Sequence, residues 1–412
     1  MKSPSRRTFV TALGAIPAAL TEPVRLVAAA AKPVRIKNID IFPIEIPIPK
    51  EELEMGKYAR YTFYEVETDV GVHGYNFDRG ADYSMLDGFI RPALVGKDLF
   101  AVEQHLKAGL GRWGGVELAI WDAIGKIAGQ PVYRLLGGAA SRLRVYLTCV
   151  WKGKADQTDV PYSAQAETAL KIKQAGIGGM KIRAWRATST DDADACGEIR
   201  AAVGPDFSIM VDRNVGPGGR LWDYPAALRA ARALEKHNVA WLEEPFSRED
   251  FFSPARLRRE VAIRITGGER YEGLDAYREC LVHDCFDMLQ PDAVICGGIL
   301  TAVKIATLAA AFHKPVCLHG SMGLRLAGWI QISAAIGAPW QELALITPPL
   351  MPEQQWDPAL KVLNSRTVFT IRDGQIDVPQ GPGLGLDVNR EAVDRFRIPL
   401  SPGRSFYPQY PG

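Results

Sequence analysis

A regular alternation of strand-like and helix-like segments begins at residue 144 and continues to residue 345. The strand-like runs are short and nearly continuous in Val, Ile, Leu and Phe, as expected for strands covered on both faces. Between them lie Ala-rich helical patterns such as YPAALRAARALEKH and ILTAVKIATLAAAFH. The eight runs are 144–151, 178–184, 207–214, 239–246, 263–270, 286–293, 314–320 and 341–345. Eight strands separated by helices at a steady spacing predict an α/β fold of the TIM-barrel type.

The segments on either side of this region have a different pattern. Residues 34–76 read as strands, and the helical segments after them end with VELAIWDAIGKIAG, which predicts an α+β domain before the barrel. Near the end of the chain, VFTIRDGQIDVP predicts a hairpin around Asp373-Gly374. We expect this hairpin to lie outside the barrel and to return to the first domain. The predicted boundaries are 32–140 for the α+β domain, 141–360 for the barrel and 361–412 for the returning segment.

The first 31 residues have the composition of an export signal rather than of a folded domain. Arg6 and Arg7 precede an apolar run from Phe9 to Leu20, which is too short to span a bilayer, and Ala28 to Ala30 supply small residues for cleavage. The stretch SRRTFV resembles a twin-arginine signal. We therefore expect an exported, periplasmic protein. The alternative is a frayed basic N-terminus, and we expect no membrane span elsewhere.

Charge and cysteine usage exclude several classes of partner. Forty-nine basic and 47 acidic residues give a net charge of +2, which provides no basic field for a phosphate backbone, so nucleic-acid binding is disfavoured. The six cysteines form neither a CxxC pair nor a zinc-like cluster, and we expect most of them to be buried. A small-molecule ligand is the expected partner.

Polar residues stand at the carboxyl ends of the predicted strands, which is where eight-stranded α/β barrels carry their chemistry. The second strand ends in Lys181-Ile182-Arg183 and the third in Asp212-Arg213-Asn214. The later strands end in or carry Glu243, Glu269, Asp292, His319 and Glu342. Successive groups are 23 to 31 residues apart, about one strand and one helix, so one barrel brings them all to one mouth.

Three of these groups predict a metal site. Asp212, Glu243 and Glu269 lie on adjacent strands and would repel one another unless a cation lies between them. Ligands that are all oxygen, without Cys or His, favour a hard ion, with Mg²⁺ before Mn²⁺ or Ca²⁺. The alternative is a network of structural salt bridges.

Several short stretches occur together in a fixed order. They are VELAIWDAIGKIAGQPVYRLLGG, MKIR, IMVDRNVG, WLEEPF, GGER, QPDAVICGGI, LHGS and GPGLGLD. On these stretches, and over roughly residues 34–400, the chain resembles the enolase superfamily and, within it, the mandelate racemase and muconate lactonizing enzyme branch. The resemblance implies a modified (β/α)7β barrel under an N-terminal α+β capping domain that the C-terminal segment completes. It also implies one Mg²⁺ held by Asp212, Glu243 and Glu269, and a dyad of His319 with Asp292.

The chemistry that this resemblance implies is removal of the proton next to a carboxylate, with a divalent ion stabilising the second negative charge as it forms. His319 is the expected base, because an ordinary His pKa of about 6.5 lets it accept and return a proton at neutral pH. Asp292 would hold its ring in one tautomer. Glu342 matches the family acid that hydrogen-bonds the substrate carboxylate, and we expect burial to raise its pKa and keep it protonated.

The chain departs from the racemases of this branch at the second strand. Those racemases have Lys-x-Lys and use the second lysine as the base for the opposite face, whereas this chain has Lys181-Ile182-Arg183. Arginine offers donors but no acceptor. We therefore expect Lys181 to neutralise the substrate carboxylate, and Arg183, with Arg186 and Asn214 as further candidates, to bind substrate oxygens. One competent base argues against simple racemisation.

These expectations combine into a Mg²⁺-dependent lyase. We expect syn dehydration of an acid sugar, an aldonate or aldarate, to a 2-keto-3-deoxy acid. The alternative within the superfamily is a racemase, epimerase or cycloisomerase, and the alternative from another class is a metal-bearing sugar-acid binding protein without turnover. The loop 49–61, with Lys50, Lys57 and Arg60, is the expected specificity lid by family position. Relatives in this family are commonly symmetric, so we also expect a homo-oligomer.

Overall fold

The computed structural model describes residues 32–80, 85–151, 158–213 and 221–399. The described residues from Val34 onward form one compact unit. The predicted export signal in residues 1–31 lies outside the described residues, and so does Asn214, a candidate for binding substrate oxygens. Within the described ranges, no helix combines the length and the apolar character needed to cross a membrane.

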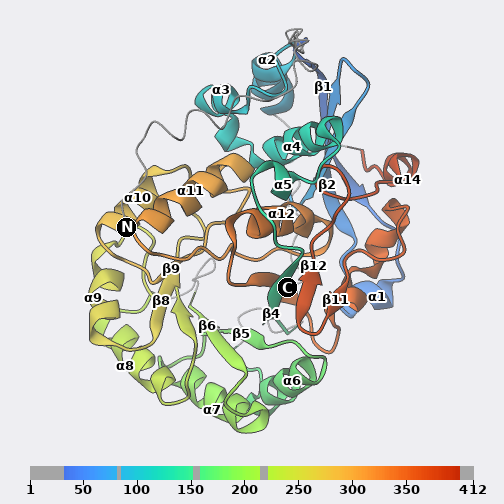
Figure 1. Cartoon of the computed structure of the whole chain (residues 1–412). Helices are drawn as coiled ribbons and strands as arrows, with labels where there is room; N and C mark the ends of the chain where they lie inside the picture. The colour runs from blue at the N-terminus through green and yellow to red at the C-terminus, as the bar shows by residue number, and fades with distance from the viewer. Residues whose placement is uncertain (1–31, 81–84, 152–157, 214–220, 400–412) are drawn as a thin grey trace, which may run out of the picture. The chain divides into compact units, whose positions relative to one another are not determined.

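The central element is a ring of parallel strands with helices around it (Figure 1). Strands β4 to β9 pair in chain order, and β10 pairs with β4. The strands are β4 (Arg142–Cys149), β5 (Gly179–Arg183), β6 (Ser208–Asp212), β7 (Trp241–Glu243), β8 (Arg264–Gly267), β9 (Met288–Leu289) and β10 (Gln341–Ile346). The helices are α6 (Tyr162–Gln174), α7 (Asp191–Val203), α8 (Tyr224–Glu235), α9 (Phe252–Glu260), α10 (Asp275–Val282), α11 (Ile299–Ala311) and α12 (Leu326–Ile336). The predicted modified TIM barrel is confirmed.

The ring closes through the segment 314–320, which is less regular than predicted. This segment follows β9, since the N–H of Cys317 donates to Leu289 O at 3.0 Å and that of His319 to Pro291 O at 3.0 Å. Pro291 has no N–H with which to continue the ladder, so no regular strand forms. Two isolated parallel bridges, Leu289 with Val316 and Ser321 with Leu343, join β9 to β10.

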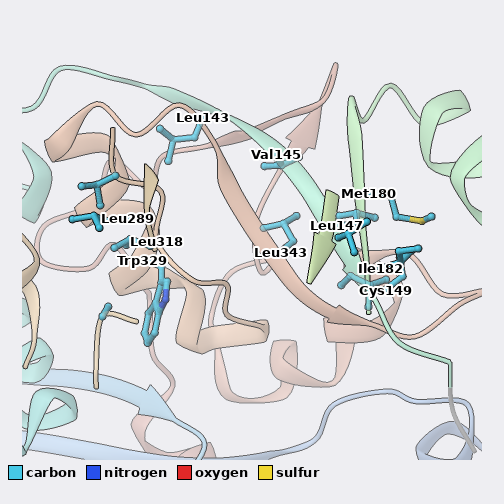
Figure 2. Packing of buried hydrophobic residues seen from close by; sticks show 14 of the residues in the cluster. Leu143, Val145, Leu147, Cys149, Met180, Ile182, Leu289, Leu318, Trp329 and Leu343 are labelled. Atoms are coloured by element: carbon cyan, nitrogen blue, oxygen red, sulfur yellow. The ribbon is translucent and has the colours of Figure 1, made fainter. Parts of the chain in front are cut away.

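The period-two alternation of side chains along the strands divides the barrel into two environments. Outward-facing residues form the layer between strands and helices, and Figure 2 shows Leu143, Val145, Leu147 and Cys149 on β4 beside Met180, Ile182 and Leu343. Inward-facing residues at the amino ends form an apolar plug of Tyr146, Met210, Trp241, Met288 and Cys317. The next inward positions along these strands are polar: Thr148, Asp212, Glu243, Gln290 and His319. The plug therefore lies beneath a cluster of polar and charged residues at the carboxyl ends of the strands. We call this cluster the charged mouth.

The capping domain is a three-stranded antiparallel sheet covered on both faces. Its strands, in the order β1-β2-β3, are Ile36–Glu45, Arg60–Thr68 and His73–Asp78. One face, with Ile39 and Val66, packs against α4, and the other, with Phe42 and Phe63, packs against the C-terminal segment. The remaining helical elements of this half are α1 (Lys50–Glu54), η1 (Leu86–Ile90), α2 (Arg91–Leu94), α3 (Val102–Lys107), η2 (Leu110–Arg112), α4 (Gly114–Ala128) and α5 (Val132–Leu135).

The C-terminal hairpin forms as predicted, but its predicted place outside the barrel is wrong. Strand β12 (Gln375–Asp377), paired with β11 (Ile371–Arg372), lies antiparallel to the first residues of β4. β5 pairs with β4 only from Leu147 onward, so the hairpin covers backbone groups that would otherwise form an open edge. Other parts of the C-terminal segment do reach the cap: Ala359 and Val362 pack against it, and beside α14 (Arg390–Arg395) the N–H of Glu45 donates to Phe396 O at 3.0 Å. The other elements after the barrel helices are η3 (Gly323–Arg325), α13 (Pro352–Trp356) and η4 (Asp357–Val362).

Candidate active site

Lys181 is the centre of the charged mouth. It lies on β5 with no exposed surface, and its Nζ is 2.7 Å from Glu243 Oε2, 2.9 Å from Glu342 Oε1 and 3.8 Å from Asp212 Oδ2. These partners come from β7, β10 and β6, so the strand register brings together residues that are far apart in the sequence. Burial alone would lower the pKa of Lys181, but the three carboxylates raise it above its usual value. Lys181 therefore keeps its charge.

Arg183 lies two residues after Lys181, at the carboxyl end of β5, and its side chain is 11% exposed. Its Nη1 donates to Asp212 Oδ2, and its guanidinium lies 5.7 Å from the ring centroid of Trp185. An arginine fixed in this way offers donors to a ligand but accepts no proton. The predicted departure from a two-base arrangement is thus present in the geometry.

Glu342 differs from its predicted protonation state. Burial would raise the pKa of Glu342, as expected, but the charges of Lys181 and His319 and the hydrogen bond from Thr148 outweigh it and hold the pKa at about 2. The N–H of Gly320 also donates to Glu342 Oε2 at 2.7 Å. A Cβ at Gly320 would lie 2.4 Å from Cγ of Glu342, so this contact requires glycine. Glu342 is a carboxylate that anchors Lys181.

His319 and Asp292 form the predicted pair. His319 Nδ1 is 3.2 Å from Asp292 Oδ2, and Asp292 Oδ1 accepts the N–H groups of Val294 and Ile295 at 2.9 and 3.0 Å. The ring's other nitrogen, Nε2, is 3.6 Å from Glu269 Oε1. Burial would lower the pKa of His319, but Glu269 and Asp292 raise it to about 9. The imidazole is therefore more basic than its ordinary pKa implied.

Several expected substrate contacts are used within the protein instead. Arg186 is buried, and its Nη2 donates to Val160 O at 2.6 Å and to Gln165 Oε1 at 3.1 Å. In the predicted lid, Lys57 pairs with Asp357 at 2.8 Å, which fastens the loop to η4. The other two lid cations also form ion pairs, Lys50 with Glu54 at 3.4 Å and Arg60 with Glu45 at 2.8 Å.

The geometry agrees with the comparisons to known proteins. A family model described as Enolase C-terminal domain-like matches residues 163–392, more than half of the chain. The chain belongs to the enolase superfamily. It is 28% identical over 352 residues to the arabinonate dehydratase of Saccharolobus solfataricus, covering 81% of this chain and 89% of that one. It is 29% identical over 287 residues to the D-galactarolactone cycloisomerase of Agrobacterium fabrum, covering 69% and 73%.

A solved structure shares the fold of this enolase-superfamily chain. The D-glucarate dehydratase from Agrobacterium tumefaciens, described as complexed with magnesium, superposes with a TM-score of 0.76 at 24% identity, over 89% of this chain and 99% of that chain. At this identity the likeness establishes the fold.

The three predicted ligands have the donor chemistry for a hard divalent ion. Asp212, Glu243 and Glu269 are buried, and Oε1 of Glu243 is a buried atom without a hydrogen-bond partner among the described residues. Burial and the charges of Asp212 and Glu342 raise the pKa of Glu243 to about 8 although Lys181 opposes them. An uncompensated carboxylate of this kind fits a cation. As placed, however, no three His, Cys, Asp or Glu side chains of the described ranges converge closely enough to hold a metal, because Lys181 and Arg183 occupy the inner oxygens.

Two inward-facing residues complete the site and were not predicted. Thr148 donates its hydroxyl to Glu342, and Gln290 Nε2 donates to Glu243 Oε2 at 2.9 Å. Both stand at the inward position that follows a plug residue, so the period of the strands carried the signal. Glu244 supports the mouth from outside, since its Oε1 accepts the N–H of Glu269 at 3.1 Å.

A cavity of about 220 Å³ lies away from this chemistry, between α6 and the outer faces of β4 and β10. Cys149, Trp151 and Ile346 are among its lining residues, and none of the predicted site residues lines it. Trp151 is therefore a wall of this outer cavity. The six cysteines, including Cys149, are all buried and free, and the sequence predicted burial for most of them.

Proposed function

We propose that this enolase-superfamily protein dehydrates an acid sugar to a 2-keto-3-deoxy acid in a magnesium-dependent reaction. The observation that carries the proposal is that β5 offers no base. Lys181 is held as a cation by Glu243 and Glu342, and Arg183 cannot accept a proton. His319 is then the single competent base. A syn elimination needs one base, because the same imidazole can take one proton and return it to the leaving group.

The residues of the chain divide this reaction among them. Arg183, which is partly exposed, binds and orients oxygens of the substrate carboxylate and its neighbouring hydroxyl, and the buried Lys181 supplies positive charge beneath it. His319 Nε2 takes the α-proton, and Asp292 stabilises the imidazolium through Nδ1. The imidazolium then protonates the β-hydroxyl, which leaves as water, and the enol product becomes the keto acid. A divalent ion held by Asp212, Glu243 and Glu269 would supply Lewis acidity toward the substrate carboxylate and offset the charge of Glu269 that favours protonated His319.

The relatives support this class of reaction. The arabinonate dehydratase is a dehydratase by name, whereas the D-galactarolactone relative is a cycloisomerase, so both outcomes exist at similar identity. A cycloisomerase also works with one proton-transferring group on one face, and we keep it as the second candidate. A racemase needs a second base, which Lys181 does not provide in its ion pairs. A binding protein without turnover would have no use for the His319–Asp292 pair.

A substrate panel tests the proposal. The mature protein with Mg²⁺ is incubated with aldonates and aldarates in ²H₂O, and 2-keto-3-deoxy products and deuterium at the α-carbon are measured. We expect keto-deoxy acid from one or a few sugars. Product isomers without loss of water would support the cycloisomerase, and the absence of both exchange and product across the panel would contradict an enzymatic role.

We further propose that the protein is exported after folding, through the twin-arginine signal in residues 1–31. The support is the Arg6-Arg7 pair before a short apolar run. Replacing both arginines with lysine should retain the protein in the cytoplasm, as measured by immunoblots of cell fractions. Equal periplasmic amounts of the variant and the parent would contradict the proposal.

A further inference from the structure

Arg325 stands at the junction of the barrel mouth and the cap. It is the last residue of η3, in the loop that follows His319. Its Nε donates to Asp78 Oδ1 at 2.5 Å, and Asp78 is the last residue of cap strand β3. The guanidinium of Arg325 is thus held by a residue of the cap, whereas the backbone of Arg325 belongs to the barrel.

Trp329 contacts both Arg325 and His319, the proposed base. The Cζ of Arg325 lies 5.0 Å from the ring centroid of Trp329, and Trp329 Nε1 donates to His319 O at 2.8 Å. The charge of Arg325 also reaches the dyad: burial would raise the pKa of Asp292, but His319 and Arg325 hold it below its usual value. Arg325 therefore lies beside the reacting groups.

Part of this guanidinium is available to a ligand. The side chain is only 9% exposed, yet within the described part of the chain no hydrogen bond uses its two terminal nitrogens. These nitrogens are also absent from the fully buried atoms that lack a partner, so they reach open space. The hydroxyl of Tyr58, close enough to feel the charge of Arg325, is buried without a hydrogen-bond partner among the described residues. Burial raises the pKa of Tyr58 to about 12, so this hydroxyl is a donor.

The local charge favours an anion. Asp78 Oδ1 also accepts the backbone N–H of Arg79 at 2.6 Å, and the charge of Asp78 acts on the guanidinium of Arg79 as well as on that of Arg325. The guanidinium of Arg79 is partly buried, which lowers its pKa, and the nearby positive charge of Arg325 lowers it further. The other acid in range, Asp292, is paired with His319. The two nearby acids, Asp78 and Asp292, are therefore both engaged, which leaves the terminal nitrogens of Arg325 to an added anion.

We propose that Arg325, assisted by Tyr58, binds a second carboxylate of the substrate, so that the substrate is a dicarboxylic acid sugar. This inference rests on the proposed function. Arg183 ends β5, and Arg325 follows the closing segment 314–320, with β10 and β4 between them in the ring. His319 stands on that same closing segment, at the mouth that Lys181 also faces. A ligand with a carboxylate at each end meets Arg183 at one end and Arg325 at the other, whereas one that ends in a hydroxymethyl group leaves the terminal nitrogens of Arg325 without a charged partner.

The test compares matched pairs of six-carbon acid sugars that differ only at the terminal carbon, galactarate with galactonate and glucarate with gluconate. For each pair, kcat/KM and the affinity of the Mg²⁺-loaded protein by calorimetry give a ratio of diacid to monoacid. We expect the parent protein to prefer the diacid. Arg325→Met should lower the ratio by about 10- to 100-fold, as expected for loss of a charged hydrogen-bond partner, and Arg325→Lys should lower it less.

Two further variants separate recognition from folding. Tyr58→Phe removes one hydroxyl without changing the charge and should also lower the ratio, by a smaller factor. Arg142→Met is the matched control, since Arg142 pairs with Asp377 at 3.1 Å at the amino end of β4, and it should keep the parent ratio. A parent preference for monoacids, or an equal loss for both acids in the Arg325 variants and in Tyr58→Phe, would overturn the inference and leave the dehydratase proposal standing. If no acid sugar is turned over, the dehydratase proposal fails, and the calorimetric ratio still decides the role of Arg325.

Discussion

Replacing Glu117 with Gln should remove a pH-dependent loss of stability at the contact between α4 of the cap and α11 of the barrel. Glu117 has no exposed surface. Its Oε2 accepts the backbone N–H of Ile299 at 2.6 Å, and its Oε1 accepts the backbone N–H of Leu300 at 3.0 Å and the indole N–H of Trp121 at 2.8 Å. A Cβ at Gly298 would lie 2.3 Å from Oε2, so the carboxyl group fills its space completely.

The size and sign of the effect follow from the carboxyl's two environments. Burial raises the pKa of Glu117 from 4.5 to about 7, although its three hydrogen bonds oppose this. Between these pH values the folded protein holds a proton that the unfolded chain has lost. The stabilisation is fully present below about pH 4.5 and is withdrawn as the pH rises through 7, with a total of about 3 kcal/mol.

The assay is urea denaturation of the parent protein and Glu117→Gln from pH 4.5 to 8. Other titrating groups are common to both proteins and cancel in the difference, so we expect the difference in unfolding free energy to move by about 3 kcal/mol in favour of Gln as the pH rises. Glu272→Gln, at an exposed position, is the control and should show a constant difference. A constant difference for Glu117→Gln would refute the reasoning, because it would mean that the helix N-terminus and the hydrogen bonds keep Glu117 ionised in the fold.

Four further outcomes are expected at the mouth. Lys181→Met leaves Glu243 and Glu342 buried without their cation and should lower the unfolding free energy by about 3–5 kcal/mol in urea denaturation, and an unchanged midpoint would contradict the ion-pair assignment. His319→Asn should reduce deuterium exchange at the substrate α-carbon by about 10²–10⁴-fold, whereas exchange at the parent rate would remove His319 as the base. Arg183→Ala should raise KM more than it lowers kcat, since Arg183 binds oxygen, and a pure loss of kcat would assign it to proton transfer. Chelation with EDTA should abolish product formation and Mg²⁺ should restore it, and activity that persists after exhaustive chelation would exclude the metal.

The sequence predicted the positions of the site residues well, because strand ends are visible in the pattern. Lys181, Asp212 and Glu243 each follow an apolar run, and parallel strands of one barrel bring such positions together. The alternation of inward and outward residues carries the same signal for Thr148 and Gln290, which stand two residues after Tyr146 and Met288. The fold class followed from the same regularity.

Protonation states and long-range pairings could not be predicted in the same way. The pKa of Glu342 depends on Lys181 and Thr148, which only the folded register places beside it, so a prediction from burial alone had the wrong sign. The hairpin at Asp373-Gly374 was visible locally, but its partner, β4, lies more than two hundred residues earlier. No local pattern in either segment specifies that pairing.

That pairing has a consequence for how the protein is made. β4 emerges from the ribosome long before β12, which pairs with its amino-terminal part. In the cap, Phe42 and Phe63 are synthesised even longer before Val393 of α14, with which they share a core cluster. Neither the barrel nor the cap can reach its final state while the chain is being translated, and such distant contacts make folding slow. The segment that carries β12 and α14 therefore completes both the barrel and the cap. A chain truncated before β12 would leave apolar surface exposed on both the barrel and the cap, and proteases and chaperones would bind such surface.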